Sequence, residues 1–328
     1  PTMIKRLHTL NFDGIMMGLI FLVLSKISLF LFKPMATDFS FDLSIGKSFF
    51  TYLAIKYPAV SIGFAQSIVF FQAYWINKTV NSLRWFGEIT YLPFWWFVVL
   101  HSFFISHQYL SENQILNLAF LYVIRQLLKR PNQDNATASA PLNVGAVFGI
   151  LLIFSPKAWM MFFILFSMIL FVGRLDAKKL LQILITAISY FLPLAYFMKW
   201  QGIPLQWKPP FSILEGYTFF TGTQDIVFYI LILFLLLASL LYRFPLKVHI
   251  YKLLNKIHLF LRTILLLSFL GIIFLFNYPT ENFILLGIPM SFLLARISWI
   301  TKYKSLFIIF FLALFLAFLY PFFDQFIG

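Results

Sequence analysis

Six polar residues of this chain have side chains suited to chemistry, and all fall toward the same side of the predicted fold. They are Lys26, Asp38, Asp42, His101, His107 and Glu112. Carboxylates and imidazoles transfer protons as general bases or acids. A lysine within an apolar segment is usually paired or lines a cavity. These residues are therefore the candidates for a catalytic or substrate-binding site.

The two aspartates lie four residues apart in the segment Thr37-Asp38-Phe39-Ser40-Phe41-Asp42. On a short helix, side chains at this spacing share one face. Together they could hold a divalent cation through oxygen ligands, or one of them could act as a general base. The alternative is an ordinary solvated loop. We take Asp38 and Asp42 as candidate catalytic residues. We assign no metal site, and the sequence leaves the identity of any cofactor unknown.

The other candidates are predicted to bind substrate. His101, His107 and Glu112 form the densest polar group on the predicted outer side, but their spacing matches no standard metal motif. Alternatively, they cap the turn at 106–113. Lys26 lies about two-thirds of the way through its apolar segment, where a charge costs roughly 3 kcal/mol on insertion scales. Its ammonium either pairs with another side chain or lines a cavity there, or it extends to the nearby lipid headgroups.

The elements that must position these residues are predicted to be membrane-spanning helices. Hydrophobic residues make up 61% of the chain and charged residues 11%, whereas soluble domains carry about 25% charge. A helix needs about 20 apolar residues to cross a bilayer. The candidate spans are 14–32, 59–77, 91–106, 113–129, 142–155, 158–173, 180–198, 225–241, 258–277, 282–298 and 305–322. The pair within 142–173 is either two tilted spans or a re-entrant hairpin.

The distribution of basic residues predicts the orientation of these spans. With the N-terminus in the cytoplasm, eighteen of the 25 Lys and Arg residues fall on the cytoplasmic side, and six fall outside. Cytoplasmic loops carry this excess in membrane proteins. The sequence therefore predicts an all-α, polytopic transmembrane helical bundle of about 11 spans, with a cytoplasmic N-terminus and a periplasmic C-terminus. The net charge of +14 is explained by topology and lipid headgroups, with no nucleic-acid partner.

The chain is predicted to form a single integral membrane domain over 1–328. Its outer loops at 33–58 and 199–224 each have room for a short helix in the interface, and 130–140 is predicted to be a flexible cytoplasmic loop. Gly145-x-x-x-Gly149 would allow two helices to approach closely. The chain has no cysteine, which excludes disulfides and thiolate catalysis.

Three stretches within 60–200 resemble an uncharacterised family of multi-pass inner-membrane proteins from the Bacteroidota. The stretches are Phe71-Gln72-Ala73 with Ile76-Asn77 and Tyr91-Leu92-Pro93, then Asn113 to Leu118 with Arg125 to Leu128, then Asn143 to Gly149 with Phe154-Ser155-Pro156 and Phe191-Leu192-Pro193. The family pattern has an aspartate before the glycine of the third stretch. Asn143 stands near that place here, which argues against a catalytic carboxylate there. The resemblance implies a bacterial inner-membrane location.

The layout resembles, more distantly, polytopic glycosyltransferases that use polyprenyl-phosphate sugars. These enzymes have a first span, an acidic outer loop and later helix pairs broken by a proline, like 142–173 here. The resemblance implies that Asp38 or Asp42 takes the acidic-loop role, while Lys26 or a histidine meets the lipid phosphate. The chain departs from the pattern in having no large soluble C-terminal domain, no Asp-Asp pair and no intramembrane arginine on the outer side.

Three functions from different classes follow from these observations. The first is a cell-envelope protein with a glycosyltransferase-like membrane fold that handles a lipid-linked or glycan substrate at the periplasmic face. The second is a non-catalytic subunit that packs against partner membrane proteins in an envelope complex. The third is a transporter or flippase, which needs a polar path that only Lys26, Gln66, Gln72 and Asn117 could line. All three predict contact with membrane lipids.

Overall fold

The structure is a computed structural model of the whole chain, and it describes seven segments together with four isolated residues. The segments are 45–83, 89–102, 109–128, 140–172, 176–202, 252–275 and 286–299, and the isolated residues are Met16, Phe86, Leu233 and Leu237. Every element in these segments is helical, and none of the described residues lies in a strand. The prediction of an all-α fold is therefore confirmed for this part of the chain.

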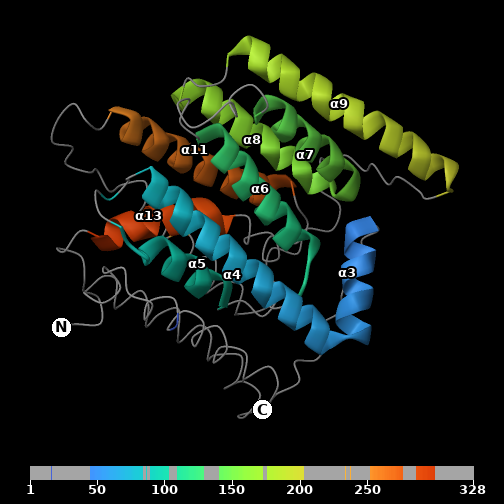
Figure 1. The fold of residues 1–328 in the computed structure, drawn as a ribbon, viewed down its shortest axis with the longest axis horizontal. Helices are drawn as coiled ribbons and strands as arrows, with labels where there is room; N and C mark the ends of the chain where they lie inside the picture. Colours follow the sequence, from blue (N-terminus) through green and yellow to red (C-terminus); the bar gives the residue numbers. More distant parts are fainter. Residues whose placement is uncertain are drawn as a thin grey trace.

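The helices follow one another along the chain in the order of the colours in Figure 1. They are α3 (Ile45–Lys56), α4 (Pro58–Ser82), α5 (Leu92–Ser102), α6 (Glu112–Leu128), α7 (Ala140–Phe154), the 3-10 helix η3 (Pro156–Trp159), α8 (Met160–Ser167), the π-helix η4 (Met168–Val172), α9 (Ala177–Trp200), α11 (Lys252–Leu275) and α13 (Gly287–Trp299). From α4 onward, each predicted span between 59 and 298 that lies in the described segments coincides with a helix. α3 lies within the predicted outer loop, where a short helix was expected.

Two of the described helices, α4 and α9, are long and apolar enough to cross a membrane. They contain 25 and 24 residues, which correspond to lengths of about 37 and 36 Å. A bilayer core is about 30 Å thick. Other apolar helical stretches are shorter: Leu92–His101, Ala140–Phe154, Lys157–Phe171, Leu259–Ser268 and Gly287–Ile297. The total of eleven spans stays a prediction, as does the choice between two spans and a re-entrant hairpin at 142–173.

Contacts between helices show that α4 and α6 run in the same direction. The hydroxyl of Ser61, near the start of α4, accepts a hydrogen bond from the N–H of Leu110, just before α6. Further along, the guanidinium of Arg125 lies over the ring of Trp75 at 5.1 Å. α5 runs the opposite way, because Asn81 at the end of α4 bonds to Thr90 just before α5.

The starts of α4 and α6 and the end of α5 therefore meet at one end of the bundle, which we call the Glu112 end. The turn after α7 lies there too, since Lys157 contacts Glu112, and so does the start of α13, since Gly287 contacts His101 at the end of α5. The guanidinium of Arg296, late in α13, lies over Phe86 at the opposite end.

α7 and α9 pack closely at the predicted small-residue motif. A Cβ atom added to Gly145 would lie 2.5 Å from the carbonyl oxygen of Ile183, and one added to Gly149 would collide with the carbonyl oxygen of Ala187. Only glycine allows backbones to approach this closely. The order of the contacts, with the earlier glycine beside the earlier residue of α9, shows that the two helices are parallel. The expectation of close approach at these glycines is confirmed.

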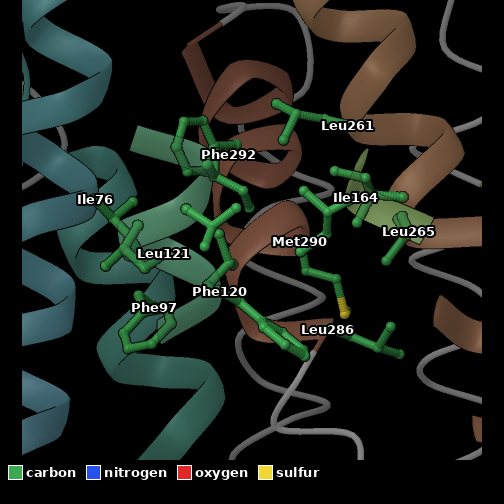
Figure 2. Close-up of a cluster of buried hydrophobic side chains, with 14 of the residues drawn as sticks. Ile76, Phe97, Phe120, Leu121, Ile164, Leu261, Leu265, Leu286, Met290 and Phe292 are labelled. Atoms are coloured by element: carbon green, nitrogen blue, oxygen red, sulfur yellow. The ribbon is translucent and has the colours of Figure 1, made fainter. Parts of the chain in front are cut away.

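The core of the bundle is apolar and rich in aromatic residues. Figure 2 shows side chains from six elements or their edges converging: Ile76 from α4, Phe97 from α5, Phe120 and Leu121 from α6, Ile164 from α8, Leu261 and Leu265 from α11, and Leu286, Met290 and Phe292 from the start of α13. All are buried. α9 differs, because only Ile183 and Ala187 of its residues are buried. α9 lies at the edge of the described bundle in Figure 1.

Candidate functional site

A partly enclosed ion pair lies at the Glu112 end of the bundle. The Nζ atom of Lys157 is 3.0 Å from Oε1 of Glu112, and it donates a hydrogen bond of 3.1 Å to Oδ1 of Asn113. The side chains of Lys157 and Glu112 are only 15% and 6% exposed. We call these three residues the Glu112–Lys157–Asn113 cluster. It joins the start of α6 to the turn between α7 and α8.

Local structure explains how the charged groups are positioned. Glu112 and Asn113 begin α6, and a carboxylate is favoured at a helix N-terminus by the unpaired N–H groups there. Lys157 lies in η3, where the hydroxyl of Ser155 caps the turn and accepts a 3.3 Å hydrogen bond from the Lys157 N–H. Glu112 and Lys157 are thus both attached to ordered backbone, Glu112 in the first turn of α6 and Lys157 in the turn η3.

Side chains of α4 hold the start of α6 in place. Besides the bond from Leu110 to Ser61, the side-chain amide of Gln72 donates a 2.8 Å hydrogen bond to the backbone oxygen of Gln114. Tyr109 lies in the connection just before α6, and burial raises the pKa of its phenol above the ordinary value. The phenol therefore stays protonated at neutral pH and is available as a hydrogen-bond donor.

Polar atoms continue from this cluster toward the middle of the bundle. Asn117 lies one helical turn beyond Asn113 and is fully buried. Its two side-chain polar atoms, and Oε1 of the fully buried Gln72, have no hydrogen-bond partner. Buried amides are nearly always hydrogen-bonded in native structures. Gln72 on α4 and Asn117 on α6 are therefore unusual among the buried side chains of the described bundle.

His101 lies in a packed position at the end of α5. Its ring stacks on Phe97 with 3.9 Å between ring centroids, and its Nδ1 lies 2.9 Å from the Phe97 carbonyl oxygen. A Cβ atom on Gly287 would be 2.5 Å from His101 Cε1, so that the start of α13 covers the imidazole. The structure thus gives His101 a role in packing α5 against α13, and its role in substrate binding stays a prediction.

The structure describes two of the six predicted site residues, Glu112 and His101. Lys26, Asp38, Asp42 and His107 lie outside the described residues. Within the described segments, no group of three His, Cys, Asp or Glu residues could hold a metal ion. Sequence reasoning noted Lys157 only as one of the outer basic residues, because a contact between residues far apart in the chain leaves no local pattern. It noted Asn113 and Asn117 but gave them no shared role.

The cluster has a defined chemical capability. Its ammonium carries N–H donors and lies within hydrogen-bonding distance of Glu112 and Asn113. An anionic group that reaches Lys157 can form a charge-assisted hydrogen bond there and would compete with Glu112 for the same cation. Lysine commonly binds phosphate as a point charge.

Comparisons of the chain with protein-family models, with curated proteins and with solved structures find no match. The function proposed for the chain therefore rests on its own residues and their geometry.

Proposed function

We propose that the chain is a multi-pass protein of a bacterial inner membrane, with about eleven spans, that handles a lipid-linked or glycan substrate at the periplasmic face. The observation that carries this proposal is the Glu112–Lys157–Asn113 cluster, a partly enclosed ammonium at one end of an apolar helix bundle. A charge is expensive in such a setting and is commonly functional. The proposal places the Glu112 end on the periplasmic side, in line with the charge pattern.

The residues have separate roles in this proposal. Lys157 contacts the phosphate of the lipid carrier, and Glu112 holds the ammonium in place while the site is empty of substrate. Asn113 supplies a neutral hydrogen-bonding group beside them. Asp38 and Asp42 are proposed to provide the general base, and Lys26 and His107 to line the same face. Any transferase activity is part of the proposal.

The first test is identification of what copurifies with the protein. The protein is extracted in a mild detergent, and mass spectrometry then identifies bound lipids and proteins together. A stoichiometric polyprenyl phosphate or glycolipid is expected. Bulk phospholipid alone, together with stoichiometric protein partners, would contradict the proposal.

A charge-swapped variant separates binding from folding. Glu112→Lys combined with Lys157→Glu keeps an ion pair between α6 and η3, but moves the ammonium to the other partner. This variant should still fold, with its stability lowered only by the ammonium at the start of α6, while the bound anionic lipid is lost. Asp38→Ala with Asp42→Ala should abolish function with normal expression. Full function in that double variant would remove the aspartates from the mechanism.

A second candidate function, a non-catalytic subunit of an envelope complex, is favoured by one feature of the structure. α9 has large exposed apolar residues on several sides, among them Leu181, Ile185, Ile188, Leu192 and Phe197. Such a surface suits either lipid or the helices of a partner. The copurification experiment distinguishes the two functions, because a subunit carries fixed protein partners and tolerates substitution of Asp38 and Asp42.

A further inference from the structure

α3 has two apolar faces, and only one of them is covered. Phe50 and Ala54 are buried, and Phe50 packs in a small cluster with Ala65 of α4 and Leu110 before α6. On another side of the helix, Phe49, Tyr52 and Ile55 are 57%, 55% and 60% exposed. Their spacing of three residues aligns them along one stripe. A short helix with a contiguous exposed apolar stripe indicates an interaction surface.

The described part of α3 is too short for a membrane span and does not follow the direction of α4. Its twelve residues correspond to about 18 Å, well short of the bilayer core of about 30 Å. Figure 1 shows that α3 turns away from the axis of α4 at the Pro58 end. α3 is therefore placed across an end of the bundle, which is the geometry of a helix lying on a membrane surface.

The charge of this segment favours an anionic partner. Between residues 45 and 60 there are two lysines and no acidic residue. The Nζ atom of Lys56 is 2.8 Å from the Tyr52 hydroxyl, and it lies over the rings of Tyr52 and Tyr57 at 5.3 and 5.6 Å from their centroids. Tyrosine and lysine are the residues that occupy the headgroup region of a bilayer. A tyrosine-framed ammonium beside an apolar stripe matches a phospholipid, whose phosphate lies next to its acyl chains.

We propose that α3 lies in the headgroup layer of one leaflet and that Lys56, with Tyr52 and Tyr57, binds a phospholipid phosphate there. This inference rests on the proposed membrane location of the bundle. The exposed stripe inserts toward the acyl chains, and Lys56 stays at the level of the phosphates. Because α3 packs beside Leu110 and Ile115 at the start of α6, it also sets the Glu112–Lys157–Asn113 cluster near headgroup depth. The substrate group that reaches Lys157 is then the headgroup of a lipid.

Spin labels measure the depth of α3 directly, since the chain has no native cysteine to remove. Single cysteines at Phe49 and Ile55 are labelled, and the protein is placed in nanodiscs of phosphatidylcholine and phosphatidylglycerol. The accessibility of each label to oxygen and to a water-soluble nickel complex gives its depth. We expect equal, shallow depths for these two labels, and greater depth for labels at Phe64 and Phe71 on the exposed side of α4.

The outcomes separate this inference from the proposed function. If the Phe49 and Ile55 labels are as accessible to nickel as a label at the exposed Gly202 while Phe71 lies deep, α3 does not contact the bilayer and the inference is overturned. This pattern is expected if the exposed stripe of α3 binds a partner protein that is absent from the nanodisc sample. If no label enters the bilayer, the proposed membrane location is itself wrong.

Lipid binding at Lys56 has its own measurement. Native mass spectrometry of the protein titrated with phosphatidylglycerol compares Lys56→Gln with Lys199→Gln, which removes an exposed lysine near the end of α9. Loss of Lys56 is expected to weaken the tightest phosphatidylglycerol site about fivefold, and loss of Lys199 to leave that site unchanged. Equal affinity in the wild type and in Lys56→Gln would refute the assignment of the phosphate to Lys56.

Discussion

The ion pair between Glu112 and Lys157 stabilises the contact between α6 and η3, and its burial makes it sensitive to single substitutions. Lys157→Met leaves the Glu112 carboxylate enclosed without its cation, which should destabilise the protein by about 3 kcal/mol. Combining Lys157→Met with Glu112→Gln removes both charges and should recover most of that loss. Thermal unfolding in detergent of the two single variants and the double variant measures the coupling energy. Strictly additive effects would show that the two groups do not interact.

The buried amide of Asn117 offers a second test at the level of one side chain. Asn117→Leu keeps a branched skeleton and removes two polar atoms that have no partner. Removing an unsatisfied buried polar group should stabilise the protein by about 1–2 kcal/mol. Gln72→Leu is the matched control, because it loses the 2.8 Å hydrogen bond to Gln114 and should not stabilise. If Asn117→Leu destabilises the protein instead, the amide makes a polar contact that stabilises the folded state.

The polar site was only partly predictable from the sequence, for a physical reason. Glu112 and Asn113 are recognisable in the sequence because they lie where a polar stretch separates the apolar segments 91–106 and 113–129. Lys157 lies far along the chain, and its pairing with Glu112 depends on how α7 returns to the start of α6. The burial of Gln72 and Asn117 also depends on how the helices pack. The sequence shows that these residues are polar but does not predict whether they face the core or the surface.

At the scale of helices, the joint between α7 and α9 depends on two glycines. Gly149→Ala adds a methyl group that collides with the backbone of Ala187, so the helices must separate. We expect a destabilisation of about 2 kcal/mol, within the range for overpacked sites. Gly63→Ala is the control, since nothing lies within 4 Å of the added Cβ atom in the second turn of α4. That variant should be neutral or slightly stabilising, because alanine favours a helix. Equal effects of both substitutions in thermal unfolding would contradict close packing at Gly149.

The start of α9 should show a pH-dependent stability. The carboxylate of Asp176 caps the helix by accepting a 2.8 Å hydrogen bond from the Lys179 N–H, and this bond lowers the pKa of Asp176. A lowered pKa in the folded state stabilises the fold above the unfolded-state value of about 3.9, and the contribution disappears as the pH falls through the folded-state pKa. Asp176→Asn keeps a capping oxygen that does not titrate. Between pH 7 and pH 3 the wild type should therefore lose more thermal stability than this variant, and parallel losses would exclude a role for the Asp176 charge.

The helices themselves were well predicted from apolar length. The predicted segment 180–198 corresponds to α9, and 142–155 corresponds to α7, because uninterrupted apolar runs have few alternatives to a helix. The observed helix ends differ from the predicted ones where a capping residue sets the end. α9, for example, begins directly after its cap Asp176 rather than at residue 180. The Gly145-x-x-x-Gly149 spacing predicted a close contact but could not identify its partner, since the motif specifies only the surface of one helix.

At the scale of the whole molecule, the proposed membrane location and the direction of each helix together predict which residues share a side of the membrane. Exposed residues Tyr57 and Gln201 belong to the Glu112 end, whereas Ser82 and Lys178 belong to the opposite end. Single-cysteine variants at these positions can be treated in spheroplasts with a membrane-impermeant maleimide. Tyr57→Cys and Gln201→Cys should react directly, and Ser82→Cys and Lys178→Cys only after permeabilisation. Reaction of Ser82→Cys and Gln201→Cys from the same side would invalidate the predicted topology.

The parallel pairing of α7 with α9 also has a consequence for the order of assembly during synthesis. Because α7 and α9 are parallel, the chain has to return to the starting end of α7 before α9 begins. The segment that contains α8 makes this return, so α9 docks only after α8 has been synthesised. The site around Ala187 emerges about forty residues after Gly149, which corresponds to a delay of about 2–8 s at typical rates of translation. During that interval the glycine surface of α7 lacks its partner α9, and in the proposed membrane location lipid or the insertion machinery shields it until α9 arrives.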